Sequence, residues 1–535
     1  MNVMNEDRVN SLPFLERVTD YVNYYAETNS NDEALVSGEI RWSYKELQKQ
    51  VDTIAKALLA MGIKKGDRVA TLSPPNHHFW ATFLASASIG AIWLGLNPRY
   101  KLEEYQYVIS DAGPKVFFAC NVIADRNYGS DLQEIVNQGN GLSQLVFLDE
   151  NLSKIKSDTL QEFCQLADQV SDECLAHARD KVLSTDPALI VYTSGSTGNP
   201  KGALLPHRGL VRCSRNQLGY YDVFPVRMQN FFPINHVACV GDVSCFCLVT
   251  GGTIFFLENF DPALSMEQVV REKITLWGGI PTTLQMCLSL PNFSEYDLSS
   301  VQQIGWGGAA ASEDLIDNLL KISPRLTSCY GLTETVGSVT YIDPTNDREI
   351  LRNTIGKPVP EYDVRLIDNA GNDVKDAELG EILVKGDFIM TGYWNRPKET
   401  QETIDELGWL HTGDIGIWLP DGNLKLLGRM GEMFKSGGYN IYPREIEQVL
   451  EVFPGVEMAA VIGVSDELYG EIGIAYIQMQ SGQNLKVKDI IQYCKELLAN
   501  YKIPKQIFIT KQLPLLPVGK IDKVKLKSDY ISSRL

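Results

Sequence analysis

Residues 68–95 read RVATLSPPNHHFWATFLASASIGAIWLG, and this stretch decides the fold class. It begins and ends with short apolar runs, 68–72 and 91–95, which have the length and composition of buried strands. Between them lies an apolar segment long enough for a helix. A strand, a helix and a second strand in this order are typical of layered α/β folds, so the sequence predicts an α/β protein.

The same alternation of predicted helices and strands continues on both sides of this stretch. Upstream, residues 42–62 repeat apolar side chains at three- and four-residue steps, and Ser43 with Glu46 has the pattern of a capping box, so an amphipathic helix is predicted there. Further apolar runs with the length of strands recur at 115–119, 144–148, 188–193, 253–257 and 302–305. Alternating helices and strands favour a large N-terminal domain of mostly parallel sheets covered by helices.

The character of the chain changes after residue 356. Short alternating strands are predicted at 363–367, 380–385 and 424–427, with turn sequences between them. They indicate a small β-barrel-like subdomain over about 356–428.

From Pro443 onward the sequence predicts a further unit. Helices are expected at 444–453 and 487–498, and strands at 457–462 and 474–478. The expected organisation is an N-terminal domain, 1–428, a hinge, 429–431, and a small mobile α+β C-terminal domain, 432–535.

Composition and charge argue against several classes of protein. The 535-residue chain has 49 Lys and Arg against 67 Asp and Glu, a formal charge of −18, so its overall field repels nucleic acid. Its ten cysteines lack the paired spacings of zinc sites and are expected to be reduced. The first 13 residues lack the features of a signal peptide, so a cytoplasmic location is expected.

One uncharged stretch, 79–96, is of borderline length for a membrane span. Serine and glycine interrupt it. We therefore expect a buried helix that runs into a buried strand, and no membrane span.

The loop that follows the strand at 188–193 gives the first chemical signal. It reads Tyr192-Thr-Ser-Gly-Ser-Thr-Gly-Asn-Pro-Lys-Gly202, with four hydroxyl side chains interleaved with glycines. Backbone N–H groups, hydroxyls and the Lys201 ammonium group can converge on a phosphate. The spacing is not that of a P-loop. A flexible linker is the alternative, but the loop stands between a buried strand and a second apolar run, 203–205, which favours phosphate binding.

Four more motifs follow in order along the chain: Tyr330-Gly-Leu-Thr-Glu334, Gly408-Trp-Leu-His-Thr-Gly-Asp414, Gly428-Arg429 through Gly438-Tyr-Asn440, and Pro517-Val-Gly-Lys520. With the loop at 192–202 they resemble the acyl-adenylate-forming superfamily of AMP-binding enzymes. This superfamily includes acyl-CoA synthetases, firefly luciferases and the adenylation domains of peptide synthetases. The resemblance covers about residues 42–523 and is closest to fatty-acyl and aryl (4-coumarate-like) acyl-CoA synthetases. It implies activation of a carboxylic acid by ATP.

The resemblance also implies a nucleotide site. The implied residues are Thr193, Ser194, Gly195, Ser196, Thr197, Gly198, Lys201, Gly308, Ala309, Ala310, Tyr330, Gly331, Asp414, Arg429 and Lys435. Tyr330 would stack on adenine, Asp414 would accept the ribose hydroxyls, and Arg429 would donate to ribose or phosphate. Lys435 resembles a second phosphate-contacting lysine.

The implied catalytic residues are Lys520, His236, Thr333 and Glu334. Thr333 would contact the α-phosphate, and Glu334 would hold Mg²⁺, a cation that prefers oxygen ligands. Lys520 would bridge the carboxylate and the α-phosphate; without its motif it would be read as a solvated surface lysine. His236 would orient the carboxylate at the mouth of the acid pocket, with a structural core histidine as the alternative.

A second half-reaction would transfer the acyl group to the thiol of coenzyme A. Gly437 and Gly438 would let the backbone approach the pantetheine arm after the C-terminal domain has rotated. Gly431 departs from the family, which usually has Asp or Lys at this pivot position, so the polar contacts of the usual residue are absent here.

The acid pocket is expected to draw on residues 237–248, 277–283, 306–311 and 336–340. These segments are apolar or small and offer no lysine or arginine for a second carboxylate, which favours a hydrophobic fatty or aromatic acid. An amino acid is disfavoured, with Asp242 as a possible exception. An enzyme that loads a carrier protein and a luciferase-like oxidative enzyme are the alternatives to an acyl-CoA ligase. The final Ser533-Arg-Leu535 resembles a peroxisomal address, the alternative to a cytoplasmic location.

Overall fold

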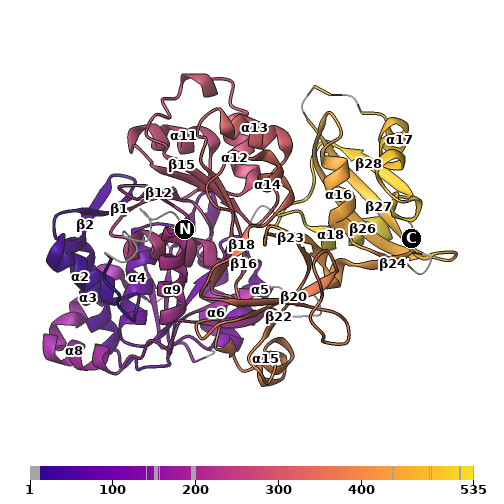
Figure 1. The fold of residues 1–535 in the computed structure, drawn as a ribbon. Coiled ribbons are helices and arrows are strands. Elements are labelled where there is room, and N and C mark those ends of the chain that lie inside the picture. Colours follow the sequence, from indigo (N-terminus) through magenta and orange to yellow (C-terminus); the bar gives the residue numbers. More distant parts are fainter. Residues whose placement is uncertain are drawn as a thin grey trace.

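The computed structural model describes residues 12–139, 141–149, 155, 157–193, 200–436, 439–480, 482–483, 485–516 and 520–533. The large N-terminal part is built around two large sheets (Figure 1). The eight-stranded sheet has the order β21 (Gly392–Tyr393), β11 (Lys201–Pro206), β10 (Pro187–Thr193), β4 (Ile92–Leu96), β3 (Arg68–Leu72), β5 (Val116–Ala119), β8 (Gln144–Phe147) and β9 (Asp158–Thr159).

The nine-stranded sheet supplies most of the strands that lead into the candidate site. Its order is β18 (Lys357–Pro358), β17 (Gly337–Tyr341), β16 (Leu326–Leu332), β15 (Gln303–Gly307), β14 (Leu276–Gly279), β12 (Arg227–Asn230), β13 (Thr253–Phe256), β1 (Glu33–Ser37) and β2 (Ile40–Ser43). Neighbouring strands in the series β1, β13, β12, β14, β15 and β16 pair in parallel, so the carboxyl ends of these strands meet at one edge. Ligands of open α/β sheets bind at such an edge.

The stretch at 68–95 folds as predicted. Strands β3 and β4 pair in parallel, with Val69 opposite Trp93, and helix α4 (His77–Ser88) connects them. All residues of α4 from Phe79 onward are buried, because α4 contacts β4 and β10 of one sheet and β1 of the other. The prediction of a buried helix leading into a buried strand is confirmed. Over the part of the chain that the structure describes, no helix combines the length and apolarity needed to cross a bilayer.

Helix α3 (Tyr44–Ala60) is the predicted amphipathic helix. The Ser43 hydroxyl accepts a hydrogen bond from the Glu46 N–H, and the Glu46 carboxylate accepts one from the Ser43 N–H, at 3.3 and 2.8 Å. The capping box is therefore present, and it satisfies backbone donors at the start of the helix. Other helices cover the sheets: α2 (Asp20–Thr28), α5 (Leu102–Ala112), α6 (Gly129–Asn137), α7 (Leu160–Gln165), α8 (Asp172–Asp180), α9 (His207–Leu218), α11 (Pro262–Arg271), α12 (Pro281–Leu288), α13 (Glu313–Leu320), α14 (Arg348–Asn353) and α15 (Pro397–Thr403).

A four-stranded antiparallel sheet corresponds to the predicted β subdomain. Its order is β19 (Asp363–Ile367), β20 (Gly380–Lys385), β22 (Leu410–Trp418) and β23 (Leu424–Arg429). The sheet has two edge strands, β19 and β23, so it does not close into a barrel. The chain leaves it at Arg429 for the C-terminal unit.

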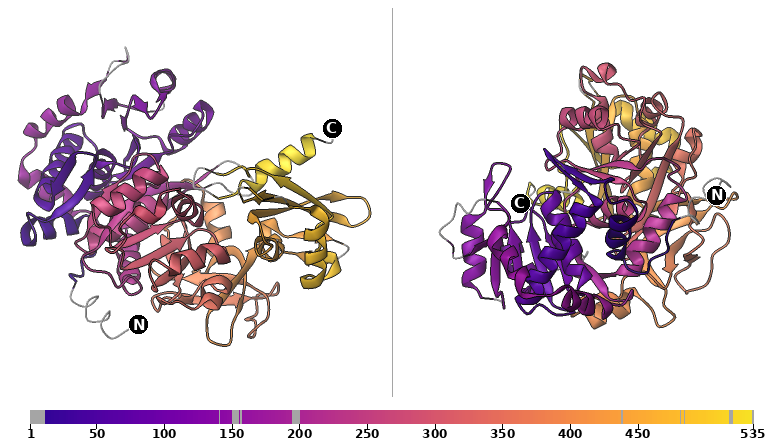
Figure 2. Two further views of the ribbon diagram at one scale, coloured as in Figure 1. Left: turned by 90° about the horizontal axis from the view of Figure 1, so that it is seen from above. Right: turned by 90° about the vertical axis from the view of Figure 1, so that its left-hand side faces the viewer.

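The C-terminal unit is an α+β sandwich. Its sheet contains β24 (Phe434–Ser436), β25 (Tyr439–Ile441), β26 (Val456–Asp466), β27 (Gly470–Met479) and β28 (Gln506–Thr510). Alternate residues of β26 enter separate cores, Val461 beneath α16 (Pro443–Glu451) and α17 (Val487–Leu497), and Ile462 beneath α18 (Lys523–Ser532). Figures 1 and 2 show this unit, in yellow, lying against one side of the larger part.

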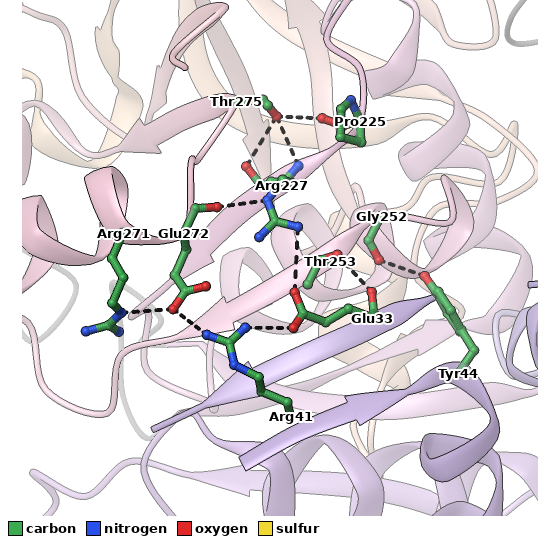
Figure 3. A network of polar contacts seen from close by, with 10 residues as sticks. All are labelled: Glu33, Arg41, Tyr44, Pro225, Arg227, Gly252, Thr253, Arg271, Glu272 and Thr275. Carbon is green, nitrogen blue, oxygen red and sulfur yellow. Dashed lines mark hydrogen bonds and ion pairs between the residues drawn. The ribbon is translucent and has the colours of Figure 1, made fainter. Parts of the chain in front are cut away.

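An ion network joins β1, β2 and β12 to the end of α11 (Figure 3). The Glu272 carboxylate is 4% exposed and accepts hydrogen bonds from Arg41 at 2.7 Å and from Arg271 at 2.9 Å. Arg41 also donates to Glu33 at 2.7 Å, and Arg227 donates to the Glu272 carbonyl at 2.8 Å. Burial tends to raise the pKa of Glu272, but the two guanidinium groups outweigh it, so the pKa is lowered.

We expect Glu272→Gln to lower the free energy of unfolding by about 1–2 kcal/mol at pH 7, because it leaves two half-exposed arginines without their shared anion. A carboxylate with a lowered pKa stabilises the fold above its unfolded pKa, and this stabilisation is lost as the pH falls through the folded pKa. The gap between wild type and variant should therefore shrink below the ordinary value of 4.5. Denaturant unfolding from pH 7 to pH 3 measures it, and a gap independent of pH would contradict the assignment.

Candidate active site

Asp414 lies at the centre of the predicted nucleotide site. It is 2% exposed and stands on β22, opposite Arg429 of β23. The Tyr330 hydroxyl donates to its Oδ2 at 2.6 Å, and Nε of Arg429 donates to its Oδ1 at 2.9 Å. Residues from three separate motifs are thus brought together. A carboxylate has about four acceptor positions, so this one can still accept ribose hydroxyls.

Glu334 forms a second cluster, which joins the Tyr330 motif to the phosphate loop. Its Oε1 accepts hydrogen bonds from the Tyr393 hydroxyl at 2.7 Å and from the Thr193 hydroxyl at 3.4 Å. Nζ of Lys201 lies 5.2 Å from the centre of the Tyr393 ring. Among the described residues no hydrogen bond reaches Oε2 of Glu334, which leaves one carboxylate oxygen for a cation.

Lys520 reaches this region from the C-terminal unit. A methyl group placed on Gly308 would lie 3.6 Å from Cε of Lys520, so the side chain lies directly beside the loop that follows β15. Burial and the nearby Arg429 lower the pKa of Lys520, whereas Asp414 acts in the opposite direction. The ammonium group therefore stands close to the predicted ribose and phosphate residues.

His236 lies half-buried just before η2 (Ala238–Cys245). The N–H of Ala238 donates to Nδ1 of His236 at 3.1 Å, so in the neutral ring the proton is on Nε2. Burial, together with the positive charge of Lys520, lowers the pKa of His236 to about 4. The ring is thus neutral at pH 7 and presents an N–H donor suited to a carboxylate.

The structure places the remaining predicted residues in different ways. Gly308, Ala309 and Ala310 form an exposed loop after β15, and Gly331 and Thr333 lie at the end of β16 beside Tyr330. Lys435 is exposed on β24, where its N–H donates to Glu471; among the described residues no contact links it to Asp414, Glu334 or Lys520. Seven predicted residues lie outside the described residues: Ser194, Gly195, Ser196, Thr197, Gly198, Gly437 and Gly438.

Sequence reasoning missed Tyr393, which contacts Glu334. It also missed the cluster that anchors both described ends of the phosphate loop to α5. The Tyr192 hydroxyl donates to Asp111 at 2.7 Å, Arg396 donates to the same carboxylate at 2.7 Å, and the Tyr107 hydroxyl donates to the Pro200 carbonyl at 3.0 Å. No local pattern marks these residues, because they meet through long-range contacts: the pairing of β21 with β11 brings Tyr393 and the nearby Arg396 to the loop, and α5 supplies Tyr107 and Asp111.

Comparison with known proteins identifies the family of this chain. The family model "AMP-binding enzyme" matches residues 22–394, and "AMP-binding enzyme C-terminal domain" matches residues 445–520. The chain belongs to the AMP-binding enzymes. The predicted family and the predicted α/β fold with a smaller C-terminal unit are therefore confirmed.

Relatives of this AMP-binding enzyme cover nearly its whole length. A feruloyl-CoA synthase from Amycolatopsis sp is 32% identical over 499 residues, 93% of this chain and 96% of the relative. The human medium-chain acyl-CoA ligase ACSF2, mitochondrial, is 31% identical over 511 residues, 91% of this chain and 83% of the relative. The crystal structure of the anthranilate CoA ligase AuaEII has a TM-score of 0.86 at 22% identity and covers 98% of this chain and 100% of that one, a likeness of fold. At the level of enzyme class, the prediction of an AMP-forming acid–CoA ligase is confirmed.

Proposed function

We propose that this enzyme adenylates a hydrophobic fatty or aromatic acid with ATP, and then transfers the acyl group to coenzyme A. The observation that supports the first step is the position of Lys520 beside Gly308, close to Asp414, Arg429 and His236. These residues come from both units of the chain. Their convergence gives one place where a nucleotide and a carboxylate can meet.

In the first half-reaction a carboxylate oxygen attacks the α-phosphorus of ATP, and pyrophosphate leaves. The reactants are both anionic, so the barrier comes largely from the crowding of negative charge, which fixed cations and donors relieve. We assign this role to Lys520 at the carboxylate and α-phosphate, to Lys201 at the departing phosphates, and to the Nε2–H of His236 at the carboxylate. Asp414 and Arg429 would hold the ribose.

Glu334 would hold a magnesium ion. Its Oε1 is oriented by the Tyr393 and Thr193 hydroxyls, and an oxygen donor of this kind suits a hard cation. A bound Mg²⁺ would neutralise part of the charge of the phosphates. Thr193 and Tyr393 would contribute by holding the Glu334 carboxylate in a fixed orientation.

The second half-reaction needs the thiol of coenzyme A in the place that Lys520 fills. We propose that the unit beyond the hinge at 429–431 rotates as a small domain, which withdraws Lys520 and brings the segment near Tyr439 to the site. We also propose a cytoplasmic location, which the ten free cysteines favour.

A pyrophosphate-release screen over acids of graded length and aromaticity tests this function. We expect hydrophobic acids to be used at least about tenfold better than dicarboxylic acids of equal length, because the predicted pocket segments hold no cation for a second carboxylate. Mass detection of the thioester reports the acceptor. Pyrophosphate release without any CoA thioester would overturn the second step, and a preference for dicarboxylic acids would overturn the pocket assignment.

A further inference from the structure

Asp242 is the one residue between 239 and 249 that keeps accessible surface; every other residue of this stretch is buried. It stands in the middle of η2, a π-helical segment that contacts α9, β12 and β17. π-Helical turns are frequent at functional sites. Its neighbours along the segment are buried, whereas part of Asp242 remains accessible.

No cation lies against this carboxylate. In the described part of the chain no hydrogen bond or ion pair reaches its two oxygens; the contact of Gln217 is to the backbone carbonyl. The groups near it are hydroxyls and thiols. Burial is the largest cause of their raised pKa values, and the negative charge of Asp242 is one of the further causes for each of them: Tyr221, Tyr341, Tyr362, Cys213, Cys245 and Cys329. Burial without a cation raises the pKa of Asp242 itself to about 7.

Asp242 also lies beside a segment that is predicted to line the acid pocket. A methyl group on Gly337 would lie 3.1 Å from its Oδ1, and Gly337 begins the strand that follows Glu334. Its helical segment begins at Ala238, two residues after His236. The carboxylate therefore belongs to one segment predicted to line the acid pocket, 237–248, and lies beside a second, 336–340.

We propose that Asp242 is a specificity-determining residue that accepts a hydrogen bond from the acid, and that the acid carries a hydroxyl or amino group remote from its carboxyl group. This inference rests on the proposed function and narrows its substrate class. The surrounding aromatic rings and thiols would contact the apolar part of the acid. The Asp242 carboxylate would contact the hydroxyl or amino group at the far end of the acid.

The physical reason is the cost of a buried carboxylate without a partner. An acid that carries a donor forms a hydrogen bond with this carboxylate. An acid of the same shape without the donor desolvates the carboxylate without forming a hydrogen bond that compensates for the cost. A site built to bind a polar group rejects the analogue that lacks it far more strongly than an apolar pocket rejects an added hydroxyl.

Two matched sets of acids test this inference by pyrophosphate release. The first set is 3-phenylpropanoic acid with its 4-hydroxy and 4-amino derivatives, and the second is octanoic acid with its 8-hydroxy and 8-amino derivatives. We expect at least one derivative to exceed its parent in kcat/KM by about tenfold or more. The hydroxyl, the neutral arylamine and the alkylammonium group are thereby distinguished as donors.

Asp242→Leu should bring the ratio of derivative to parent to about one or below. Asp242→Asn, which keeps the shape, should give an intermediate ratio because a neutral amide is a weaker acceptor. Asp222→Asn, in an ion pair with Arg325, serves as the control and should leave all ratios unchanged.

The outcomes separate the two proposals. If wild type uses the parents as well as their derivatives, or if Asp242→Leu leaves a high ratio in place, the role of Asp242 is overturned and the proposed function stands. If no acid of any screen releases pyrophosphate, the proposed function falls, and the inference with it. Melting curves show which variants are folded. If a variant is unfolded, the ratio of derivative to parent kcat/KM in wild type still tests the inference.

Discussion

Lys520→Ala should lower the rate of pyrophosphate release by about 10²–10³-fold with every acid that the enzyme uses. In the proposed first half-reaction the ammonium group lies between the carboxylate and the α-phosphate, and alanine would leave that charge crowding uncompensated. The loss should appear mainly in kcat, because an interaction made in the transition state is removed. ATP binding through Asp414 and Arg429 should be retained, so the Kd for ATP changes little.

The same variant separates the two half-reactions. Supplied acyl-adenylate should be converted to the CoA thioester at a rate within a few fold of wild type, since the proposed rotation withdraws Lys520 in that step. Lys525→Ala is the matched control, because Lys525 lies on α18 in an exposed pair with Asp529 and should leave both rates unchanged. Wild-type rates in Lys520→Ala, or an equal loss in both half-reactions, would refute the role given to this lysine.

The sequence predicted elements well where local pattern decides them. The apolar runs at 68–72 and 144–148 became β3 and β8 with boundaries shifted by no more than one residue, and Ser43 with Glu46 formed the capping box. In these segments burial and backbone hydrogen bonding act in the same direction as the local residue preferences.

Long-range contacts were beyond the sequence. The motifs indicated Glu334 as a ligand, but its orientation depends on Tyr393, which arrives through the pairing of β21 with β11. Asp242 was noted for its charge, yet nothing local shows that its neighbours are buried and neutral. The absence of barrel closure likewise depends on which edges of β19 and β23 find partners, and periodicity does not encode that.

Gly431→Pro is expected to leave adenylation within a few fold of wild type and to lower thioester formation by on the order of 100-fold. Gly431 lies in a single 3-10 turn, η4 (Met430–Glu432), between β23 and β24. Proline fixes φ near −65°, a value that such a turn accepts, so the arrangement with Lys520 beside Gly308 should form. Rotation of the C-terminal unit requires new backbone angles at the hinge, and proline resists that change.

Gly431→Ala provides the control for this hinge. Alanine removes the special freedom of glycine but does not lock φ, so both half-reactions should stay close to wild type. Pyrophosphate release and thioester formation from supplied acyl-adenylate are measured separately for the two variants. Equal losses in both reactions with proline would show that the substitution disturbs the site itself. If alanine lowered thioester formation as much as proline does, Gly431 would have a role other than rotation. The usual polar pivot residue is replaced by glycine here, so the proposed rotation would have to break contacts elsewhere, and one described contact between the two units is the hydrogen bond that Nε2 of Gln480 donates to Asp314 at 3.2 Å.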